Sequence, residues 1–276
     1  MSKALPMGQR ALFMVSGPDA LRYLNGQVSQ DVRRLNEPAN QDVALPACVT
    51  DAKGRLQALV HVFGRADGSI WVEGPGELEE ELELRLGRYL ISDDAEIENV
   101  SAEWELWHVV DCPQVPEELV RRSKRLGAEG YDLWLLPGEF CGIPLLSEAE
   151  AEARRIAAKV PAWGKELTPG MLPPEAGLDR EAISYHKGCY IGQEVLSRIK
   201  SAGKVNRRLE GFSVEAGVSE GDVLLNAEGK DAGVITSVSP LVDGETGRFR
   251  ALGFVGKAGF RVEEFSVEGK GRVRVG

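Results

Sequence analysis

The sequence predicts an α+β protein whose last part is a separate all-β domain. Between residues 10 and 159, apolar runs of strand length alternate with stretches of helical period, as in α+β sheets that carry helices on one face. After residue 207, short strands separated by glycine turns replace this pattern, which is typical of a small sandwich or barrel. Residues 160–183, which separate the two regions, are rich in proline and glycine, and ordered loops of this length are often functional.

Composition and charge argue against several classes of protein. The chain has 276 residues, of which 43% are hydrophobic and 28% charged, and its formal net charge is -10. This acidic balance argues against non-specific binding of nucleic-acid phosphates, which needs a cationic surface. The four cysteines and three histidines are dispersed, so we expect neither a metal site nor a disulfide framework. No membrane span and no signal-peptide core is present in the sequence, and we expect a reduced, cytoplasmic protein.

The first unit is expected to combine a sheet with two helices. One helix should begin at Ala20 after Pro18 and end at 25–27. The other spans 77–90, where leucines recur every four residues between acidic residues. Strands are predicted at 10–15, 43–49, 56–63, 70–72 and 95–100. Gly54 supplies a positive φ in the hairpin turn between the second and third of these strands.

The second unit is shorter, and both units could be ferredoxin-like layers. Its helix at 147–159 should begin with a capping box formed by Ser147 and Glu150. Its other predicted elements are strands at 106–110 and 133–136 and a helix at 117–126. The barrel strands are predicted at 209–214, 222–225, 233–238, 251–255, 261–267 and 271–275. We therefore predict domains at 1–102, 103–204 and 205–276.

One segment, Lys187-Gly188-Cys189-Tyr190-Ile191-Gly192-Gln193-Glu194, concentrates potential chemistry. The helical pattern that follows it predicts a turn that leads into a helix N-terminus. Free backbone N–H groups there, together with His186 and Lys187, would lower the pKa of the Cys189 thiol and make it reactive. Alternatively, Cys189 is a small buried hydrophobe, the common role of a free cysteine. The basic run at 200–208 is more simply a solvated face than an RNA-binding patch.

The segment 187–194 resembles the signature of the YgfZ-like folate-binding proteins. These proteins are relatives of the glycine-cleavage T-protein, and the mitochondrial iron–sulfur assembly factor belongs with them. Segments 17–20, 24–28 and 31–32 resemble the N-terminal part of the same family, and 252–255 lies where its barrel is expected. The resemblance, which spans nearly the full length, implies two α+β units and a C-terminal barrel around a central cleft for tetrahydrofolate. It also implies a role in maturing or repairing iron–sulfur enzymes, with a link in bacteria to tRNA modification.

The resemblance assigns roles to individual residues. Cys189 is the candidate catalytic thiol, and Lys187 either lowers its pKa or meets the glutamate tail of the folate. Glu175 resembles the T-protein glutamate that holds the pterin ring, whose amino and ring N–H groups suit a carboxylate acceptor. Gln193 and Glu194 occupy signature positions and are candidates for cofactor binding, and Tyr190 is a candidate for stacking on the pterin.

The residues leave other roles open. Glu194 can form an ordinary helix pair with Arg198, four residues on, and Gln193 can cap the helix. The T-protein also has an aspartate pair in the strand after its N-terminal hairpin, and one of the two serves aminomethyl transfer. Gln57 and Ala58 stand at the matching positions and cannot ionise near neutral pH, so aminomethyl transfer to the glycine-cleavage system is not expected.

Three functions follow as hypotheses. The leading one is a tetrahydrofolate-binding accessory protein whose partners are iron–sulfur client or assembly proteins. The alternative is a folate-dependent aminomethyl or one-carbon transferase acting on an unidentified amine. The third is a binding module that uses the cleft only for contact with another protein.

Overall fold

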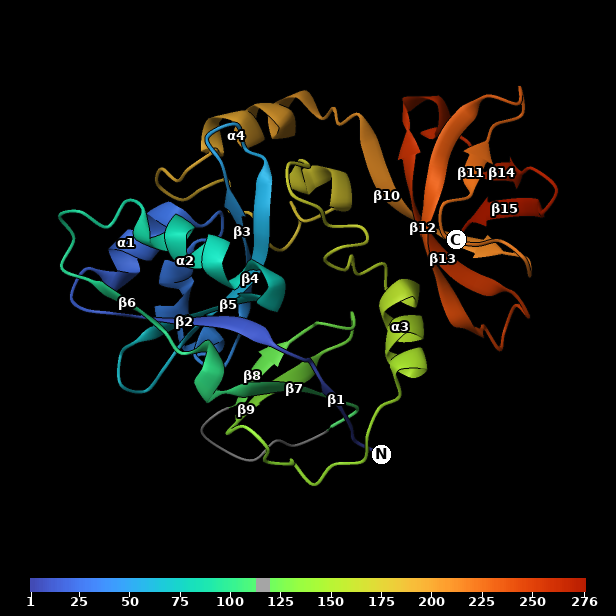
Figure 1. Ribbon diagram of the computed structural model, residues 1–276. Helices are drawn as coiled ribbons and strands as arrows, with labels where there is room; N and C mark the ends of the chain where they lie inside the picture. Colours follow the sequence, from blue (N-terminus) through green and yellow to red (C-terminus); the bar gives the residue numbers. More distant parts are fainter. Residues whose placement is uncertain (113–119) are drawn as a thin grey trace.

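The computed structural model describes residues 1–112 and 120–276. In this part of the chain, two antiparallel sheets and a closed barrel lie around the middle of the molecule (Figure 1). The first sheet has the order β3-β4-β5-β2-β6 and the second has the order β1-β7-β9-β8. No helix among the described residues is both long and apolar enough to cross a membrane.

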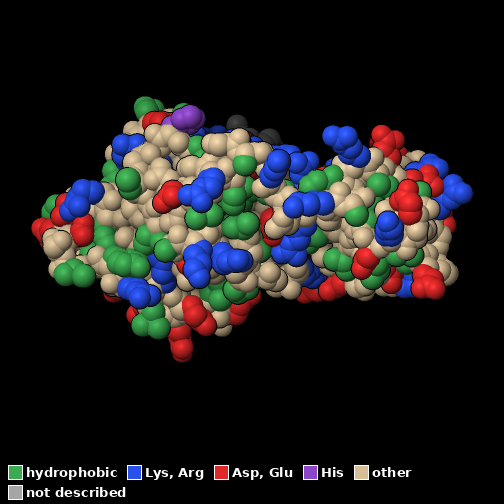
Figure 2. All heavy atoms as spheres, turned by 90° about the horizontal axis from the view of Figure 1, so that it is seen from above, with side chains coloured by type: hydrophobic (Ala, Val, Ile, Leu, Met, Phe, Trp, Pro, Cys, Tyr) green, Lys and Arg blue, Asp and Glu red, His purple; other side chains and the backbone are tan. Residues whose placement is uncertain are grey.

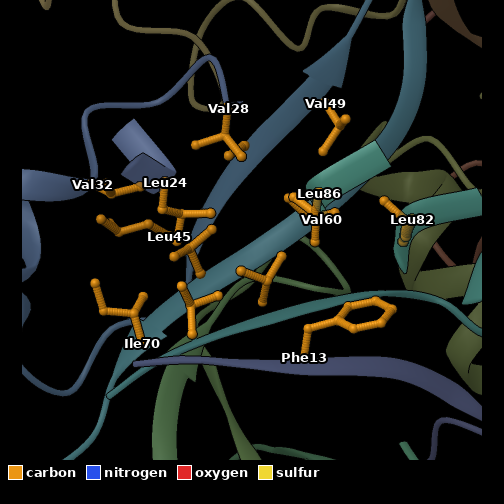
Figure 3. Packing of buried hydrophobic residues seen from close by; sticks show 14 of the residues in the cluster. Phe13, Leu24, Val28, Val32, Leu45, Val49, Val60, Ile70, Leu82 and Leu86 are labelled. Atoms are coloured by element: carbon orange, nitrogen blue, oxygen red, sulfur yellow. The ribbon is translucent and has the colours of Figure 1, made fainter. Parts of the chain in front are cut away.

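The first sheet carries two helices on one face. Its strands are β2 (Arg10–Ser16), β3 (Leu45–Thr50), β4 (Leu56–Gly64), β5 (Ile70–Pro75) and β6 (Glu96–Asn99). The helices, α1 (Ala20–Gln27) and α2 (Glu79–Gly87), cover a buried cluster that includes Leu24, Val60 and Leu86 (Figure 3). The two predicted helices are therefore present. The predicted hairpin turn is present too, and Gly54 has a φ of 69°.

Side-chain alternation along β4 gives the sheet its second face. Ala58, Val60 and Val62 belong to the helix-covered core, so the odd-numbered side chains point the other way. On that other face, Phe63, Trp71 and Trp134 join the two sheets, and the Phe63 and Trp134 ring centroids are 5.8 Å apart. The two sheets are thus packed on each other through an aromatic cluster.

The second sheet contains two strands outside the sequence predictions. Its strands are β1 (Lys3–Pro6), β7 (Glu105–Val110), β8 (Val120–Ser123) and β9 (Gly130–Leu135). The helix predicted at 117–126 is wrong at 120–123, which pair with β9 as a strand; the part at 117–119 lies outside the described residues. Because β1 pairs with β7, the N-terminal strand belongs to the second sheet. The domain division at residues 102 and 204 remains a proposal.

Helix α3 (Glu148–Ala157) begins with the predicted capping box of Ser147 and Glu150 and lies against the barrel (Figure 1). The barrel strands close in the order β10-β13-β12-β11-β14-β15. Their bounds are β10 (Arg207–Val214), β11 (Val223–Leu225), β12 (Asp231–Val242), β13 (Phe249–Gly256), β14 (Glu264–Val267) and β15 (Gly271–Val275). Helix α4 (Gln193–Ala202) leads from the first sheet to β10 (Figure 1). The six predicted barrel strands are all present.

Candidate functional site

The 187–194 segment is hydrogen-bonded to the C-terminal end of α1 and to the end of β3. The backbone N–H of Ile191 donates to the carbonyl oxygen of Gly26, and the Thr50 hydroxyl donates to the carbonyl oxygen of Ile191 at 2.6 Å. Just before the segment, the Ser29 hydroxyl donates to the carbonyl oxygen of Ala182, also at 2.6 Å. Two stretches that are far apart in the sequence, 24–32 and 187–194, therefore meet in the fold.

Lys187 holds this contact together. Its buried ammonium group donates to the carbonyl oxygens of Asn25, Val28 and Gln30 over 2.5–2.8 Å. Burial lowers the pKa of Lys187 to about 7, but three acceptors require all three N–H groups and so favour the charged form. The ammonium has no N–H left for the Cys189 sulfur. Its position at the end of α1 suits the negative end of the helix dipole.

The other residues of the segment divide between surface and core. Cys189 is exposed and free, so the alternative that it is a buried hydrophobe is wrong. Tyr190 is buried with Cys48 and Leu196 in a cluster to which the first sheet, the 160–183 loop, α4 and the barrel contribute. The centroid of its ring lies 5.1 Å from the Lys187 nitrogen, and burial raises the pKa of its hydroxyl. Tyr190 therefore packs where the first sheet and the barrel are joined.

Gln193 and Glu194 form the start of α4. The Gln193 amide donates to the carbonyl oxygen of Lys187 at 3.4 Å. The exposed Glu194 carboxylate accepts from Arg198 at 2.7 Å, four residues on. The helix pair considered from the sequence is therefore present. Such exposed pairs stabilise a helix by only a few tenths of a kcal/mol, about 0.2–0.5.

The position of residue 192 in the fold requires a glycine. Gly192 is the N-cap of α4, with a φ of 87°. A Cβ at this position would lie 2.6 Å from the carbonyl oxygen of Asp51 and 2.9 Å from the Cα of Gly54. The hairpin turn of the first sheet and the start of α4 approach each other so closely that neither glycine has room for a side chain.

A large cavity opens where the three parts meet. Its volume is ≈ 1930 Å³, and both sheets, the 160–183 loop, α4 and β10 contribute to its wall. Glu175, in the short 3-10 helix Pro173–Ala176, lines this cavity and also a neighbouring one of ≈ 510 Å³. The wall of the large cavity does not include Lys187, Cys189, Tyr190, Gln193 or Glu194. The roles predicted for these five residues in catalysis or cofactor binding remain predictions.

Glu175 has the geometry of a hydrogen-bond acceptor for a ligand. Its side chain is 9% exposed, and its Oε2 accepts from the Arg207 guanidinium at 2.9 Å. Oε1 has no hydrogen bond to any residue in the described ranges. Arg207 itself lies over the Phe254 ring, 4.3 Å from its centroid. The carboxylate is thus held in place from one side and free to accept from the other.

The positions matched to the T-protein aspartates differ in exposure. Ala58 is fully buried in the core between the sheet and its helices. Gln57 is exposed where the pairing of β3 with β4 is irregular, and its side-chain oxygen accepts from Arg85 of α2 at 3.0 Å. Gln57 does not line the cavity, and its amide cannot take the role of a carboxylate at neutral pH.

A buried charge cluster in the cavity wall was not predicted from the sequence. Arg10, His61 and Arg125 line the cavity and surround the carboxylate of Glu73, which is fully buried. Arg125 also donates to Asp132 of the second sheet. The signal for this face was present in β4, where Gln57, Leu59 and His61 alternate with three apolar residues. Across residues 1–112 and 120–276, no three His, Cys, Asp or Glu side chains are grouped as metal ligands.

The entrance region of the cavity is basic. Lys200, Lys204 and Arg208 line the cavity where α4 leads into β10, and Figure 2 shows Lys and Arg side chains gathered near the middle of this face. Lys200 faces Asp179 at 3.6 Å. Lys204 and Arg208 have no carboxylate partner among the described residues, although Arg208 lies over the Phe260 ring.

Comparison with known proteins identifies the fold. No family model matches the chain. An uncharacterized protein of Haemophilus influenzae is 28% identical over 249 residues, which are 86% of this chain and 84% of that protein. The crystal structure of the glycine cleavage system aminomethyltransferase T from Bartonella henselae is similar over 99% of this chain and 84% of that chain, with a TM-score of 0.82 and 16% sequence identity. The chain therefore has the fold of the glycine-cleavage T-protein, an α+β fold with a closed six-stranded barrel, as the sequence predicted.

Proposed function

We propose that the central cavity binds tetrahydrofolate or a one-carbon derivative of it. The observation that carries this proposal is the Glu175 carboxylate, which lines a large cavity at the junction of the three parts and whose Oε1 has no partner among the described residues. A reduced pterin presents amino and ring N–H groups, and a buried carboxylate is the acceptor that suits them. At ≈ 1930 Å³ the cavity exceeds the volume usual for small-ligand sites, about 300–1,000 Å³, and has room for an elongated ligand.

The basic entrance fits the other end of a folate. A folate carries a glutamate tail with carboxylates, and Lys204 and Arg208 line the same cavity without a carboxylate partner in the described ranges. Because Lys187 uses its three N–H groups within the protein, we assign the tail to these entrance cations in place of Lys187. Such a contact would be weakened by salt, since exposed charges are screened.

We further propose that the protein is an accessory factor that supports the assembly or repair of iron–sulfur proteins in the cytoplasm, with a link to tRNA modification. The sequence resemblance of 187–194 to the YgfZ-like signature supports this role. The exposed Cys189, beside the glycine of residue 188, is then available to a client or assembly protein at the surface. Gln57 supports an accessory role over aminomethyl transfer, because its amide lacks a proton-handling carboxylate.

The first test is a calorimetric titration of the wild type and the variant Glu175→Gln with tetrahydrofolate. The loss of one charged acceptor should weaken binding by about 1.5–3 kcal/mol, or about 10- to 150-fold. Glu181→Gln is the matched control, because Glu181 lines the same cavity but is exposed and pairs only at 3.7 Å with Lys124. If the wild type binds no tetrahydrofolate, or if Glu175→Gln binds as tightly as the wild type, the proposal is wrong.

The second test separates accessory and transferase roles. Incubation of the protein with tetrahydrofolate and candidate aminomethyl donors, whose transferable carbon is already at the oxidation level of formaldehyde, should give no 5,10-methylenetetrahydrofolate if the role is accessory. Product formation would favour the folate-dependent one-carbon transferase. The variant Cys189→Ala should bind tetrahydrofolate like the wild type, because Cys189 is outside the cavity wall. Its defect, if the accessory role holds, should appear only in the activity of iron–sulfur client enzymes.

A further inference from the structure

Two carboxylate–imidazole pairs lie in the interface between the sheets. In one, Nδ1 of His61 lies 3.1 Å from Oε2 of Glu73. In the other, Nδ1 of His108 lies 3.0 Å from Oδ1 of Asp132. Arg125 joins the two pairs, with its Nη2 2.8 Å from Oε2 of Glu73 and its Nε 2.8 Å from Oδ1 of Asp132.

The two imidazoles differ in their exposure to the cavity. His108 is fully buried, and its Nε2 is enclosed without a partner among the described residues. Gly130 packs against this nitrogen, since a Cβ there would lie 2.8 Å from it. His61 instead lines the central cavity, and its side chain is 15% exposed. Its Nε2 has no hydrogen bond within the described ranges and is not among the enclosed atoms.

The neighbours of His61 fix its tautomer. Glu73 accepts hydrogen bonds and cannot donate, so the nitrogen beside it must carry the proton. Nη1 of Arg125 is also close to Nδ1, at 3.3 Å, but the contact of Nδ1 with the Glu73 carboxylate is shorter, at 3.1 Å, and a charged acceptor makes the stronger hydrogen bond. Nδ1–H therefore donates to Glu73, and the lone pair of Nε2 is free on the cavity side.

The surrounding charges keep the imidazole neutral. Arg10 and Arg125 both pair with Glu73, and Arg125 also pairs with Asp132. Burial first, and then the charge of Arg125, lower the pKa of His61 below its ordinary value, and Glu73 opposes this only in part. At neutral pH, His61 is thus a hydrogen-bond acceptor at its cavity-facing nitrogen.

We propose that His61 and Glu73 form a hydrogen-bond-accepting pair in the cavity, in which Nε2 of His61 accepts from an N–H group of a ligand. This inference rests on the proposed function and names the reduced folate as that ligand. Glu73 accepts from Nδ1–H and so holds the imidazole in the orientation that leaves the Nε2 lone pair available on the cavity side.

The test uses acylation of the wild-type protein by diethyl pyrocarbonate, which attacks unprotonated imidazole nitrogens. The chain has three histidines, and peptide mass analysis follows each of them. His186 is exposed and should react fastest, and the fully buried His108 should not react. His61 should react, and saturating tetrahydrofolate should slow its acylation at least about tenfold.

A second measurement is independent of any ligand. Long-range ¹H–¹⁵N correlation spectra should show the Nδ1–H tautomer for His61, and added tetrahydrofolate should shift its Nε2 resonance. An Nε2–H tautomer, or acylation as slow as that of His108, would overturn the inference whether or not folate binds. Calorimetric binding of tetrahydrofolate without protection of His61 would overturn it as well. No binding at all would instead reject the proposed function, and with it the ligand named for this pair.

Discussion

At the scale of single residues, the contacts of Lys187 differ from those expected from the sequence. The sequence places this cation two residues before a thiol, and local reasoning assigns it to that thiol. The fold instead turns it inward, onto three carbonyl oxygens at the end of α1. Those acceptors are more than 150 positions away in the chain, so no local pattern contains the information. Glu175 was predicted as a pterin ligand from the family resemblance, but its pairing with Arg207 through Oε2 could not be predicted.

The contacts of Lys187 predict a stability effect. The variant Lys187→Met keeps most of the apolar stem and removes the donors of three backbone carbonyls. Each buried acceptor left without a partner is worth about 1–3 kcal/mol, so we expect the free energy of unfolding to fall by about 3 kcal/mol or more. Urea unfolding followed by circular dichroism measures this. Lys204→Met, at an exposed cation without a carboxylate partner in the described ranges, should stay within about 0.5 kcal/mol of the wild type.

A different result would reassign Lys187. Suppose that Lys187→Met unfolds at the same urea concentration as the wild type but no longer supports the iron–sulfur client enzymes. Lys187 would then have a functional role, and its three hydrogen bonds at the end of α1 would not stabilise the fold.

At the scale of elements, local patterns predicted α1, α3 and the barrel strands but failed at β8. The sequence Val120-Arg121-Arg122-Ser123 gave no apolar alternation, because the side chains that point inward are Arg121 and Ser123. Arg121 donates to the carbonyl oxygen of Gly64, and Ser123 donates to Asp132. A buried polar residue whose hydrogen-bond partner is distant in the chain cannot be distinguished from an exposed polar residue by the local sequence. Pairing with β9 therefore decided the structure against local preference.

The contact between the hairpin turn and α4 predicts unequal roles for two glycines of the 187–194 segment. Gly192→Ala would place a Cβ within 3 Å of main-chain atoms of Asp51 and Gly54 at a positive φ. We expect a loss of about 2 kcal/mol or more in the free energy of unfolding, since both the clash and the backbone conformation oppose alanine. Thermal and urea unfolding measure this loss.

Gly188 is the matched control within the same segment. No heavy atom lies within 4 Å of a Cβ built at this position. Gly188→Ala should therefore change the free energy of unfolding by no more than about 1 kcal/mol. Equal effects of the two substitutions would show that the close approach at Gly192 does not control the stability of this junction.

At the scale of the whole molecule, Arg125 connects the two sheets. Its side chain is 5% exposed and pairs with Glu73 of the first sheet and Asp132 of the second. Burial alone would raise the pKa of Glu73, but Arg10 and Arg125 outweigh it and hold the pKa well below its ordinary value. The pKa of Asp132 is lowered in the same way. None of these pairings follows from local periodicity, which is why the sequence predicted strands of both sheets but not what joins the sheets.

The charge cluster predicts a pH-dependent effect of Arg125→Met. The variant leaves two buried carboxylates with fewer cations, and breaking a buried pair in this way destabilises a protein by about 3–5 kcal/mol.

In the wild type, these carboxylates have pKa values below those of the unfolded chain. Their stabilising contribution is therefore complete above about pH 4.5 and is lost as the pH falls through the lowered values. In the variant, the carboxylates take up protons at higher pH, which relieves the uncompensated charge. The difference in the free energy of unfolding between the wild type and Arg125→Met should be largest at about pH 7 and smaller at about pH 4.

Urea unfolding at both pH values measures this difference. Arg198→Met is the control, because the loss of its exposed pair with Glu194 should change the free energy of unfolding by only about 0.2–0.5 kcal/mol at either pH. A difference that is constant with pH would mean that Arg125 stabilises the interface by packing alone, because only the charges of Glu73 and Asp132 couple its removal to protons.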